Sequence, residues 1–296
     1  MTFRPEPTFR HGQPPRTAVL LVNLGTPDEP TPRALRRYLA EFLSDPRVVE
    51  IPRAVWWPIL HGIILNTRPA KSAAKYATVW MPEGSPLAVW TARQTAGVAA
   101  QLAAHGHHLT VRHAMRYGNP GMPAALDRLR AEGATRILVL PLYPQYAAAT
   151  TASVADRLMQ WAAGARRLPA LRFVAEYHDD AGYIEALARR VEAHWQAQGR
   201  ADRLVLSFHG VPHRSLLLGD PYHCQCHKTA RLLGARLGLG GDELVVTFQS
   251  RFGKARWLEP YTEPTLVAMA SSGVRRVDVM CPGFVADCLE TLEEIA

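Results

Sequence analysis

The sequence predicts an α/β protein built from two similar Rossmann-like lobes, each a parallel sheet flanked by helices, with a cleft between them. Short apolar runs alternate with helix-like segments along nearly the whole chain, which is the pattern of parallel strands joined by right-handed crossovers. The 296 residues are enough for two domains of ordinary size. Segment 20–27 also weakly resembles 205–212, and 136–141 resembles 276–282. Similar lobes indicate a cleft, where small molecules prefer to bind.

The N-terminal lobe is expected over residues 1–168. Its buried strands are predicted at 17–23, 109–116 and 136–141. Its helices are predicted at 31–43, 85–104, 120–132 and 151–165. Leu35, Tyr38 and Leu39 recur at helical spacing in the first of these helices, and Ser85 before Pro86 forms a plausible N-cap for the second. A Gly-, Arg- and Pro-containing stretch at 164–169 then suggests the boundary between the lobes.

An apolar segment over residues 51–66, which we call the apolar lip, interrupts this lobe. Prolines and Arg53 break its apolar run, so it is too short to span a bilayer. The adjacent Trp56 and Trp57 suit a membrane interface. Two interpretations stay open: a core helix, or an exposed lip that touches a membrane or shelters an apolar ligand.

The C-terminal lobe is expected over residues 169–296. Its strands are predicted at 171–175, 204–208, 243–249 and 277–280, and its helices at 181–198, 229–237 and 262–272. The strand at 204–208 runs directly into His209, followed by a glycine and a proline. Ligands of open α/β sheets gather at the carboxyl ends of strands, so His209 is a candidate functional imidazole. The alternative is a histidine that only caps a turn.

Charge and composition narrow the function classes. Lys and Arg together exceed Asp and Glu by 34 − 26 = 8, which suits an anionic small molecule, a membrane surface or nucleic acid. No basic run is interleaved with aromatic residues, so nucleic acid is the least favoured partner. Residues 1–16 lack the apolar core of a signal peptide, which favours a cytoplasmic protein, with membrane association through the lip left open.

Three acidic residues follow the last strand. Asp287, Glu290 and Glu294 are spaced i, i+3 and i+7, so a helix there would present them on one face. The helix dipole alone accounts for Asp287 and in part for Glu290, but Glu294 lies too far along. Such a row of acids can conduct protons or a divalent cation.

The order and spacing of several motifs resemble the ferrochelatase family. In the C-terminal half the matching segments are SFHGVP at 207–212, GDPY at 219–222, FQSRFG at 248–253, WLEPYT at 257–262 and PGFVADCLETL at 282–292. In the N-terminal half they are NLGTP at 23–27, GSP at 84–86, MRY at 115–117 and PLYPQY at 141–146. The resemblance implies two Rossmann-like lobes and insertion of Fe²⁺ into protoporphyrin IX, the last step of haem synthesis, without a required cofactor.

The resemblance also implies roles for individual residues. His209 and Glu290 match the metal-binding and catalytic positions, and Asp287 and Glu294 match the path for protons or metal. A neutral imidazole or a carboxylate can accept a pyrrole proton or ligate Fe²⁺, so the order of events between them stays open. Six further residues match positions near the porphyrin: Arg68, Ser85, Arg116, Tyr117, Tyr143 and Phe284. The lip matches a membrane-facing pocket mouth.

Two features depart from the family pattern. The chain stops within the predicted acidic helix, where family members continue, so we expect a truncated chain. His213, His223, Cys224, Cys226 and His227 crowd a predicted loop. Some relatives carry a [2Fe–2S] cluster on four cysteines, but Cys-x-Cys is not the usual spacing, and free thiols are the favoured interpretation.

Other functions compete with this one. Within enzymes, the chain could metallate coproporphyrin or insert another divalent metal into a different tetrapyrrole. Outside enzymes, it could be a porphyrin or haem carrier that performs no chemistry. A carrier needs an apolar slot but no row of acids beside a histidine, so the acidic residues favour an enzyme.

Overall fold

In the computed structural model, residues 3–8, 11–253 and 255–295 are described, and residue contacts divide the chain into two compact units. Unit 1 comprises the residues up to Leu142, Ala148–Ala175 and Ala286–Glu293. Unit 2 comprises Tyr143–Ala147, Glu176–Val285 and the residues from Glu294 onward. Unit 1 thus extends beyond the boundary at residue 168 that the sequence suggests.

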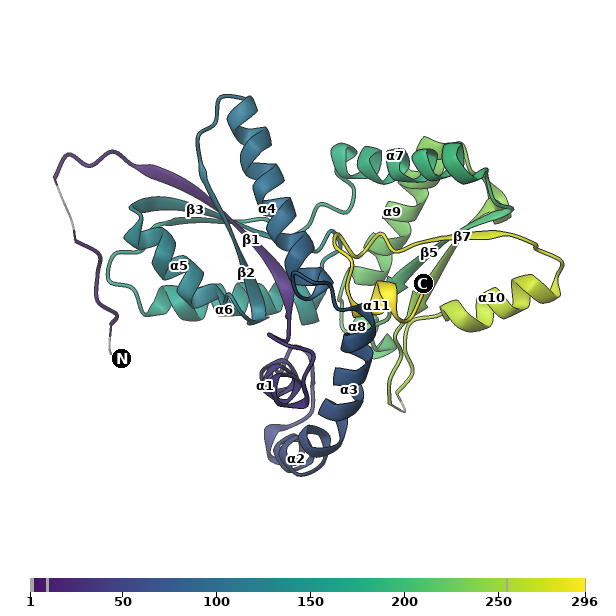
Figure 1. The fold of residues 1–296 in the computed structure, drawn as a ribbon, viewed down its shortest axis with the longest axis horizontal. Helices are drawn as coiled ribbons and strands as arrows, with labels where there is room; N and C mark the ends of the chain where they lie inside the picture. The colour runs from purple at the N-terminus through teal and green to yellow at the C-terminus, as the bar shows by residue number, and fades with distance from the viewer. Residues whose placement is uncertain (1–2, 9–10, 254, 296) are drawn as a thin grey trace. The chain divides into compact units, whose positions relative to one another are not determined.

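Unit 1 contains a four-stranded parallel sheet in the order β2-β1-β3-β4 (Figure 1). Its strands are β1 (Arg16–Thr26), β2 (Thr110–Gly118), β3 (Ala134–Pro141) and β4 (Ala170–Phe173). Residues 18–22 of β1 are buried without alternation, as expected of a central strand covered on both faces. The strand β4 was expected in the second lobe, but it pairs with β3 and completes the sheet of unit 1.

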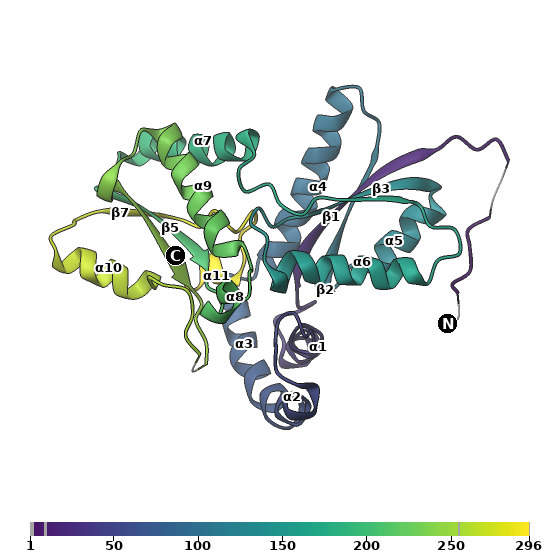
Figure 2. The same cartoon turned by 180° about the vertical axis from the view of Figure 1, so that it is seen from behind.

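Helices cover both faces of this sheet. The helices of unit 1 are α1 (Pro32–Leu43), α2 (Arg53–Ile59), α3 (Leu65–Val79), α4 (Pro86–Ala104), α5 (Met122–Ala131) and α6 (Ser153–Ala163). Helix α4 lies on one face and α5 and α6 on the other (Figures 1 and 2). The Thr31 hydroxyl accepts a hydrogen bond from the Ala34 N–H, and Pro32 opens α1, so both local signals fix where this helix begins. Two π-helical turns, η1 (Leu60–Ile64) and η2 (Ala148–Ala152), precede α3 and α6.

The apolar lip is helical and partly exposed. It runs through α2 and η1 into the start of α3. Trp56 packs into the core formed by α1 and α3 and donates its indole N–H to the Leu43 carbonyl at 2.7 Å. Val55, Trp57 and Ile63 instead point outward, with 56, 42 and 57% of their surface exposed. The core interpretation therefore holds for Trp56, and Val55, Trp57 and Ile63 are exposed; contact of these side chains with a membrane or an apolar ligand stays a prediction.

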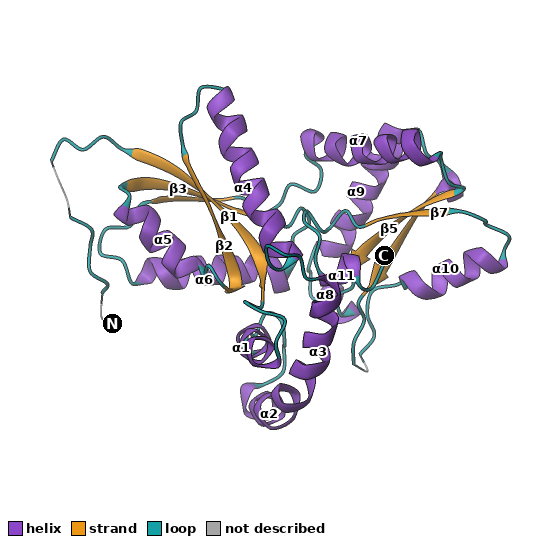
Figure 3. Ribbon diagram, viewed as in Figure 1, coloured by secondary structure: helices purple, strands orange, loops and turns teal. Residues whose placement is uncertain are grey.

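Unit 2 contains a second, three-stranded parallel sheet in the order β6-β5-β7 (Figure 3). Its strands are β5 (Arg203–His209), β6 (Leu244–Gln249) and β7 (Val277–Met280). Its helices are α7 (Ala181–Gln198), α8 (His213–Leu217), α9 (Tyr222–Leu237), the 3₁₀ turn η3 (Gly241–Glu243) and α10 (Thr262–Ser271). The predicted fold class, two parallel sheets each flanked by helices, is confirmed; the cleft stays a prediction.

Helix α9 corrects one expectation. The sequence pattern predicts a helix from Thr229 and a loop for the histidines and cysteines before it. In the structure α9 begins at Tyr222 and carries His223, Cys224, Cys226 and His227. Polar and thiol side chains hide the helical pattern, but Tyr222 and Cys226 are buried one turn apart in the core of unit 2.

Candidate functional site

His209 is the last residue of the central strand of unit 2. It lies beside Gln249, the last residue of β6, and the chain then turns sharply through Gly210. The Gly210 N–H donates to the Gln249 carbonyl at 2.8 Å. A Cβ at residue 210 would lie 2.9 Å from that carbonyl oxygen and 3.1 Å from the Trp257 ring, so only glycine fits. The turn therefore holds the imidazole at the carboxyl end of the sheet.

A backbone contact fixes the tautomer of His209. Its Nδ1 lies 2.6 Å from the Gly210 carbonyl oxygen. A carbonyl can only accept a hydrogen bond, so Nδ1 must carry the proton when the ring is neutral. Nε2 then keeps its lone pair and can accept a proton or ligate a metal.

Aromatic rings flank the half-buried imidazole within unit 2. The Phe284 and Trp257 ring centroids lie 6.2 and 6.4 Å from that of His209. Phe284 is a predicted substrate contact, and the structure brings it to His209. Trp257 belongs to a matched motif, but no role was predicted for it because the isolated tryptophan carries no periodic signal.

A buried polar network lies on the same face of the sheet as His209. Side chains alternate along a strand, so Ser207 and His209 share a face. The Ser207 hydroxyl donates to Gln249 Oε1 at 2.5 Å and lies 2.8 Å from the Thr262 hydroxyl of α10. Thr262 in turn donates to Thr247 at 2.9 Å. These residues are all buried, and their mutual hydrogen bonds make the base beneath the imidazole rigid.

The acidic residues of the C-terminal segment do not share one helix, contrary to the prediction. Helix α11 spans only Leu289–Leu292 and contains Glu290 alone. Asp287 precedes it, exposed, and accepts a hydrogen bond from the Thr291 hydroxyl at 3.2 Å. Glu294 follows it and accepts a hydrogen bond from Ser250, whose φ of 66° is rare for a non-glycine residue. The i, i+3, i+7 pattern fails because the helix is a single turn.

Glu290 lies among groups of unit 1 whose titration it affects. The pKa of the Tyr76 phenol is raised by burial and then by the nearby Glu290 and Cys288. The pKa of the Cys288 thiol is raised by burial and then by Glu290, to which it is hydrogen-bonded. Tyr76 is also hydrogen-bonded to Thr26. Tyr76 was not predicted as part of a site, because the sequence pattern did not reveal the helix α3 that positions it.

Ser85 joins the same group of side chains. It is the N-cap residue of α4 by position, as predicted, but its hydroxyl accepts a hydrogen bond from Thr26 at 2.7 Å and makes no cap bond. Because Thr26 is also bonded to Tyr76, unit 1 connects Ser85 through Thr26 and Tyr76 to the surroundings of Glu290.

Arg116 and Tyr117 form a buried ion-pair network. The Arg116 guanidinium pairs with Asp45 and donates through Nε to the Ser153 hydroxyl at 2.6 Å. The Tyr117 hydroxyl donates to the same Asp45 oxygen at 2.8 Å, and Tyr117 is fully buried. Arg116 and Tyr117, both predicted to contact porphyrin propionates, therefore stabilise unit 1 through their bonds to Asp45 and Ser153. The pattern MRY shows the residue types but not Asp45, which lies far away in the sequence.

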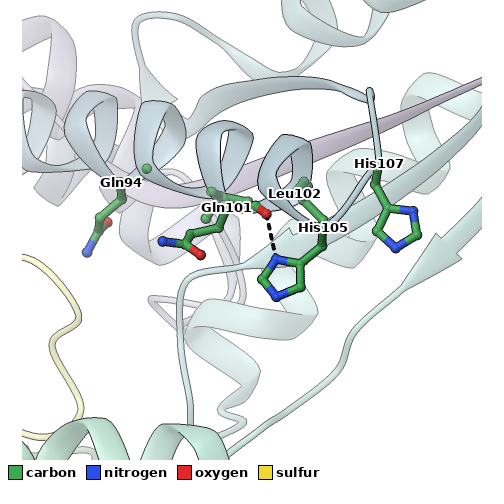
Figure 4. Close-up of a pocket in the computed structure, with 7 residues that line it drawn as sticks. Gln94, Gln101, Leu102, His105 and His107 are labelled. Atoms are coloured by element: carbon green, nitrogen blue, oxygen red, sulfur yellow. Dashed lines mark hydrogen bonds between the residues drawn. The ribbon is translucent and has the colours of Figure 1, made fainter.

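The two remaining predicted residues belong to different units. Arg68 is exposed on α3, and Tyr143 is half-buried in the segment that precedes η2. A hollow of about 570 Å³ opens on α4, lined by residues between Gln94 and His105 and by His107 (Figure 4). No predicted site residue lines this hollow.

The described residues contain no group of three or more His, Cys, Asp or Glu side chains arranged to hold a metal ion. All four cysteines have free thiols: Cys224 is exposed, Cys281 is half-buried, and Cys226 and Cys288 are buried. Burial raises the pKa of Cys226. None of the helices in the described part of the chain is long and apolar enough to cross a membrane.

Comparison with known proteins places these features in a family. The sequence profile named Ferrochelatase matches residues 16–296. A ferrochelatase of Polaromonas sp. is 67% identical over all of this chain and 82% of its own length. One from Methylibium petroleiphilum is 69% identical over the same shares. Among solved structures, SirB from Bacillus subtilis with Fe³⁺ is 12% identical, with a TM-score of 0.48 over 89% of this chain and 75% of its own.

Proposed function

The chain belongs to the ferrochelatase family, and from this premise we propose that it inserts Fe²⁺ into protoporphyrin IX to make protohaem, the last step of haem synthesis. One observation from the fold carries the chemical part of the proposal. The Gly210 carbonyl accepts the Nδ1 proton of His209, which leaves Nε2 unprotonated at the end of β5. Porphyrin metallation needs such a base, since it releases two pyrrole protons.

The proposed reaction has a simple balance. Fe²⁺ forms four bonds to the ring nitrogens, two N–H bonds break, and two protons leave; no redox change occurs. His209 Nε2 accepts a pyrrole proton or ligates the incoming cation, and the Glu290 carboxylate does the complementary task. The Gly210 carbonyl and the flanking Trp257 and Phe284 rings favour one imidazole orientation and therefore support proton transfer in a fixed geometry.

We assign secondary roles to the other candidates. Asp287 and Glu294, both exposed carboxylates, are proposed to relay protons or cations. Phe284 is proposed to contact the flat ring, which its position beside His209 supports. Arg68, Ser85 and Tyr143 are proposed to contact the porphyrin or its propionates. For Arg116 and Tyr117 the same proposal is weaker, because Asp45 and Ser153 already occupy their polar groups.

A turnover assay tests the proposal. The protein is mixed anaerobically with Fe²⁺ and either protoporphyrin IX or coproporphyrin, and the metallated product is followed by absorbance. We expect catalysed insertion into protoporphyrin. A shifted Soret band without faster metallation would show a carrier, faster insertion into coproporphyrin would show the other substrate, and preference for another divalent metal would show a different chelatase.

We further propose that the lip touches a membrane from the cytoplasmic side. The exposed side chains Val55, Trp57 and Ile63 form an apolar surface, and the Arg53 guanidinium lies 5.1 Å from the Trp57 ring centroid. Residues 51–82 contain no Asp or Glu but five basic or imidazole side chains. Apolar insertion together with positive charge is what binds a peripheral protein to anionic lipid.

Liposome sedimentation tests this contact. Replacing Val55 and Trp57 with serine should lower partitioning onto anionic vesicles about tenfold or more, since each buried apolar side chain contributes about 1.5–3 kcal/mol. Leu217→Ser is the matched control, because Leu217 is 73% exposed but lies in unit 2. Equal loss in the control, or none in the double variant, would remove the membrane role.

We propose that no resident cofactor is needed beyond the substrate iron. The four cysteines are free thiols, and Cys226 and Cys288 are buried in the cores of different units. Purified protein with the visible absorption of a [2Fe–2S] cluster would contradict this.

A further inference from the structure

Helix α9 carries two histidines that the proposed reaction does not use. His223 and His227 are four residues apart, so their side chains leave the helix on the same face. Their ring centroids lie 4.5 Å apart. Two imidazoles at this spacing on a helix are an arrangement that binds zinc-like cations, because one nitrogen of each can reach a cation at about 2.0–2.1 Å.

The ring nitrogens of this pair are available. Among the described residues, neither His223 nor His227 makes a hydrogen bond through its ring. Their ring nitrogens are also not buried polar atoms left without a partner. Their nitrogens therefore face solvent, although both rings are half-buried. Burial lowers the pKa of both imidazoles. The nearby His213 lowers the pKa of His223 further. The nearby His223 and Arg231 lower the pKa of His227 further.

An aromatic ring of the core holds the pair in place. The His223 ring stacks on Phe248, with centroids 5.8 Å apart and planes 20° from parallel. The His227 centroid lies 6.3 Å from the same ring. This contact restricts both side chains before any ligand arrives, which reduces the entropy lost on binding.

The pair is separate from His209, although both lie in unit 2. Phe248 pairs in register with Phe208, and their side chains point to the sheet face covered by α9. His209 is the next residue along β5, so its side chain points to the opposite face. A cation at the pair would therefore be a second bound ion.

We propose that His223 and His227 form an auxiliary site for one borderline divalent cation of the Zn²⁺, Ni²⁺ or Fe²⁺ kind, completed by water. The described residues hold no group of three donors here, so the site is bidentate, and exposed Cys224 is not a ligand. Arg231, one turn further along α9, opposes cation binding by charge repulsion.

Calorimetry with Zn²⁺ alone, without porphyrin, tests the site on the full chain. Relative to the unchanged protein, His223→Ala and His227→Ala should each lose one Zn²⁺ equivalent or weaken that site at least tenfold. Cys224→Ser and His105→Ala, an exposed histidine of unit 1, should bind as the unchanged protein does. Arg231→Gln should bind about twofold more tightly or better. Unaltered binding in either histidine variant, or a matching loss in Cys224→Ser, would overturn the proposal.

A second measurement needs no variant and covers the case in which a substitution unfolds α9. The unchanged protein is treated with diethyl pyrocarbonate with and without Zn²⁺, and modification of each histidine is followed by peptide mass spectrometry. Zn²⁺ should slow modification of His223 and His227 at least fivefold and leave His105 unaffected. Equal rates at the pair with and without Zn²⁺ would contradict the proposal whatever the outcome of the metallation assay.

Discussion

Replacing Asp45 with asparagine should strongly destabilise unit 1. The Asp45 and Arg116 side chains are only 6 and 12% exposed, and the Asp45 carboxylate accepts hydrogen bonds from Ser153 and Tyr117 at 2.6 and 2.8 Å. A neutral amide in place of this carboxylate would leave the Arg116 charge buried without its counter-charge. Breaking a buried pair in this way costs about 3–5 kcal/mol.

Thermal unfolding followed by circular dichroism measures this effect. A loss of about 3–5 kcal/mol lowers Tm by about 6–20 °C in a unit of this size. Asp156→Asn is the matched control, because Asp156 pairs with Arg47 at 2.8 Å and the two side chains are 42 and 43% exposed. An exposed pair contributes less than about 1 kcal/mol. If Asp45→Asn unfolded no earlier than Asp156→Asn, the buried network would not be structural.

The same pair predicts how stability depends on pH. Burial alone would raise the pKa of Asp45. Its carboxylate accepts hydrogen bonds from Ser153, the Arg47 backbone and Tyr117, and it lies near the Arg116 charge. Together these contacts outweigh burial and lower the pKa of Asp45 below its ordinary value. A group with a lowered folded pKa stabilises the fold above its unfolded pKa. The unchanged protein should therefore lose this contribution as pH falls below about 4, and Asp45→Asn should lose less over the same window. Parallel pH profiles for the two proteins would contradict this assignment.

The turn after His209 and the thiols of α9 are each open to a further test. Gly210→Ala should lower the metallation rate at least tenfold and destabilise unit 2 by about 1–3 kcal/mol, because the alanine Cβ would crowd the Gln249 carbonyl. A metallation rate within twofold of that of the unchanged protein would show that the turn does not position the imidazole. In the folded protein iodoacetamide should label Cys224 rapidly, whereas Cys226 should react only after unfolding, because it is buried and burial raises its pKa. Labelling is read by mass spectrometry, and equal labelling of the two thiols in the folded protein would contradict the buried placement of Cys226.

Strand positions were predictable because buried parallel strands are continuous apolar runs. The 17–23 run lies within β1, and the 204–208 run lies within β5. His209 was also predictable as the residue at a strand end. The sheet to which β4 belongs was not, because strand pairing is a contact between distant segments and leaves no local mark.

Helices were less predictable where polar and thiol side chains interrupt the apolar helical pattern. Helix α9 begins with histidines and cysteines, so its apolar face shows only once Tyr222 and Cys226 are seen buried. The row Asp287, Glu290 and Glu294 fits a helix by spacing, yet only one turn of helix forms. Spacing states which residues would share a face if a helix existed; it does not establish the helix.

Hydrogen-bond and ion-pair networks between residues far apart in the chain could not be predicted from the sequence. Asp45 is 71 residues from Arg116 and 108 from Ser153, and nothing in the chain pairs them in advance. Tyr76 is similarly joined to Thr26 and placed near Glu290 only by folding. Such long-range polar contacts decide whether a matched residue is available to a substrate or is already occupied.

The most direct test of the central claim is the initial rate of metal insertion by His209→Ala. If Nε2 of His209 is the base or ligand that metallation requires, the rate falls by about 10²–10⁴ while circular dichroism and Tm stay those of the unchanged protein. Insertion within threefold of the unchanged rate, with the fold intact, would show that His209 only caps a turn.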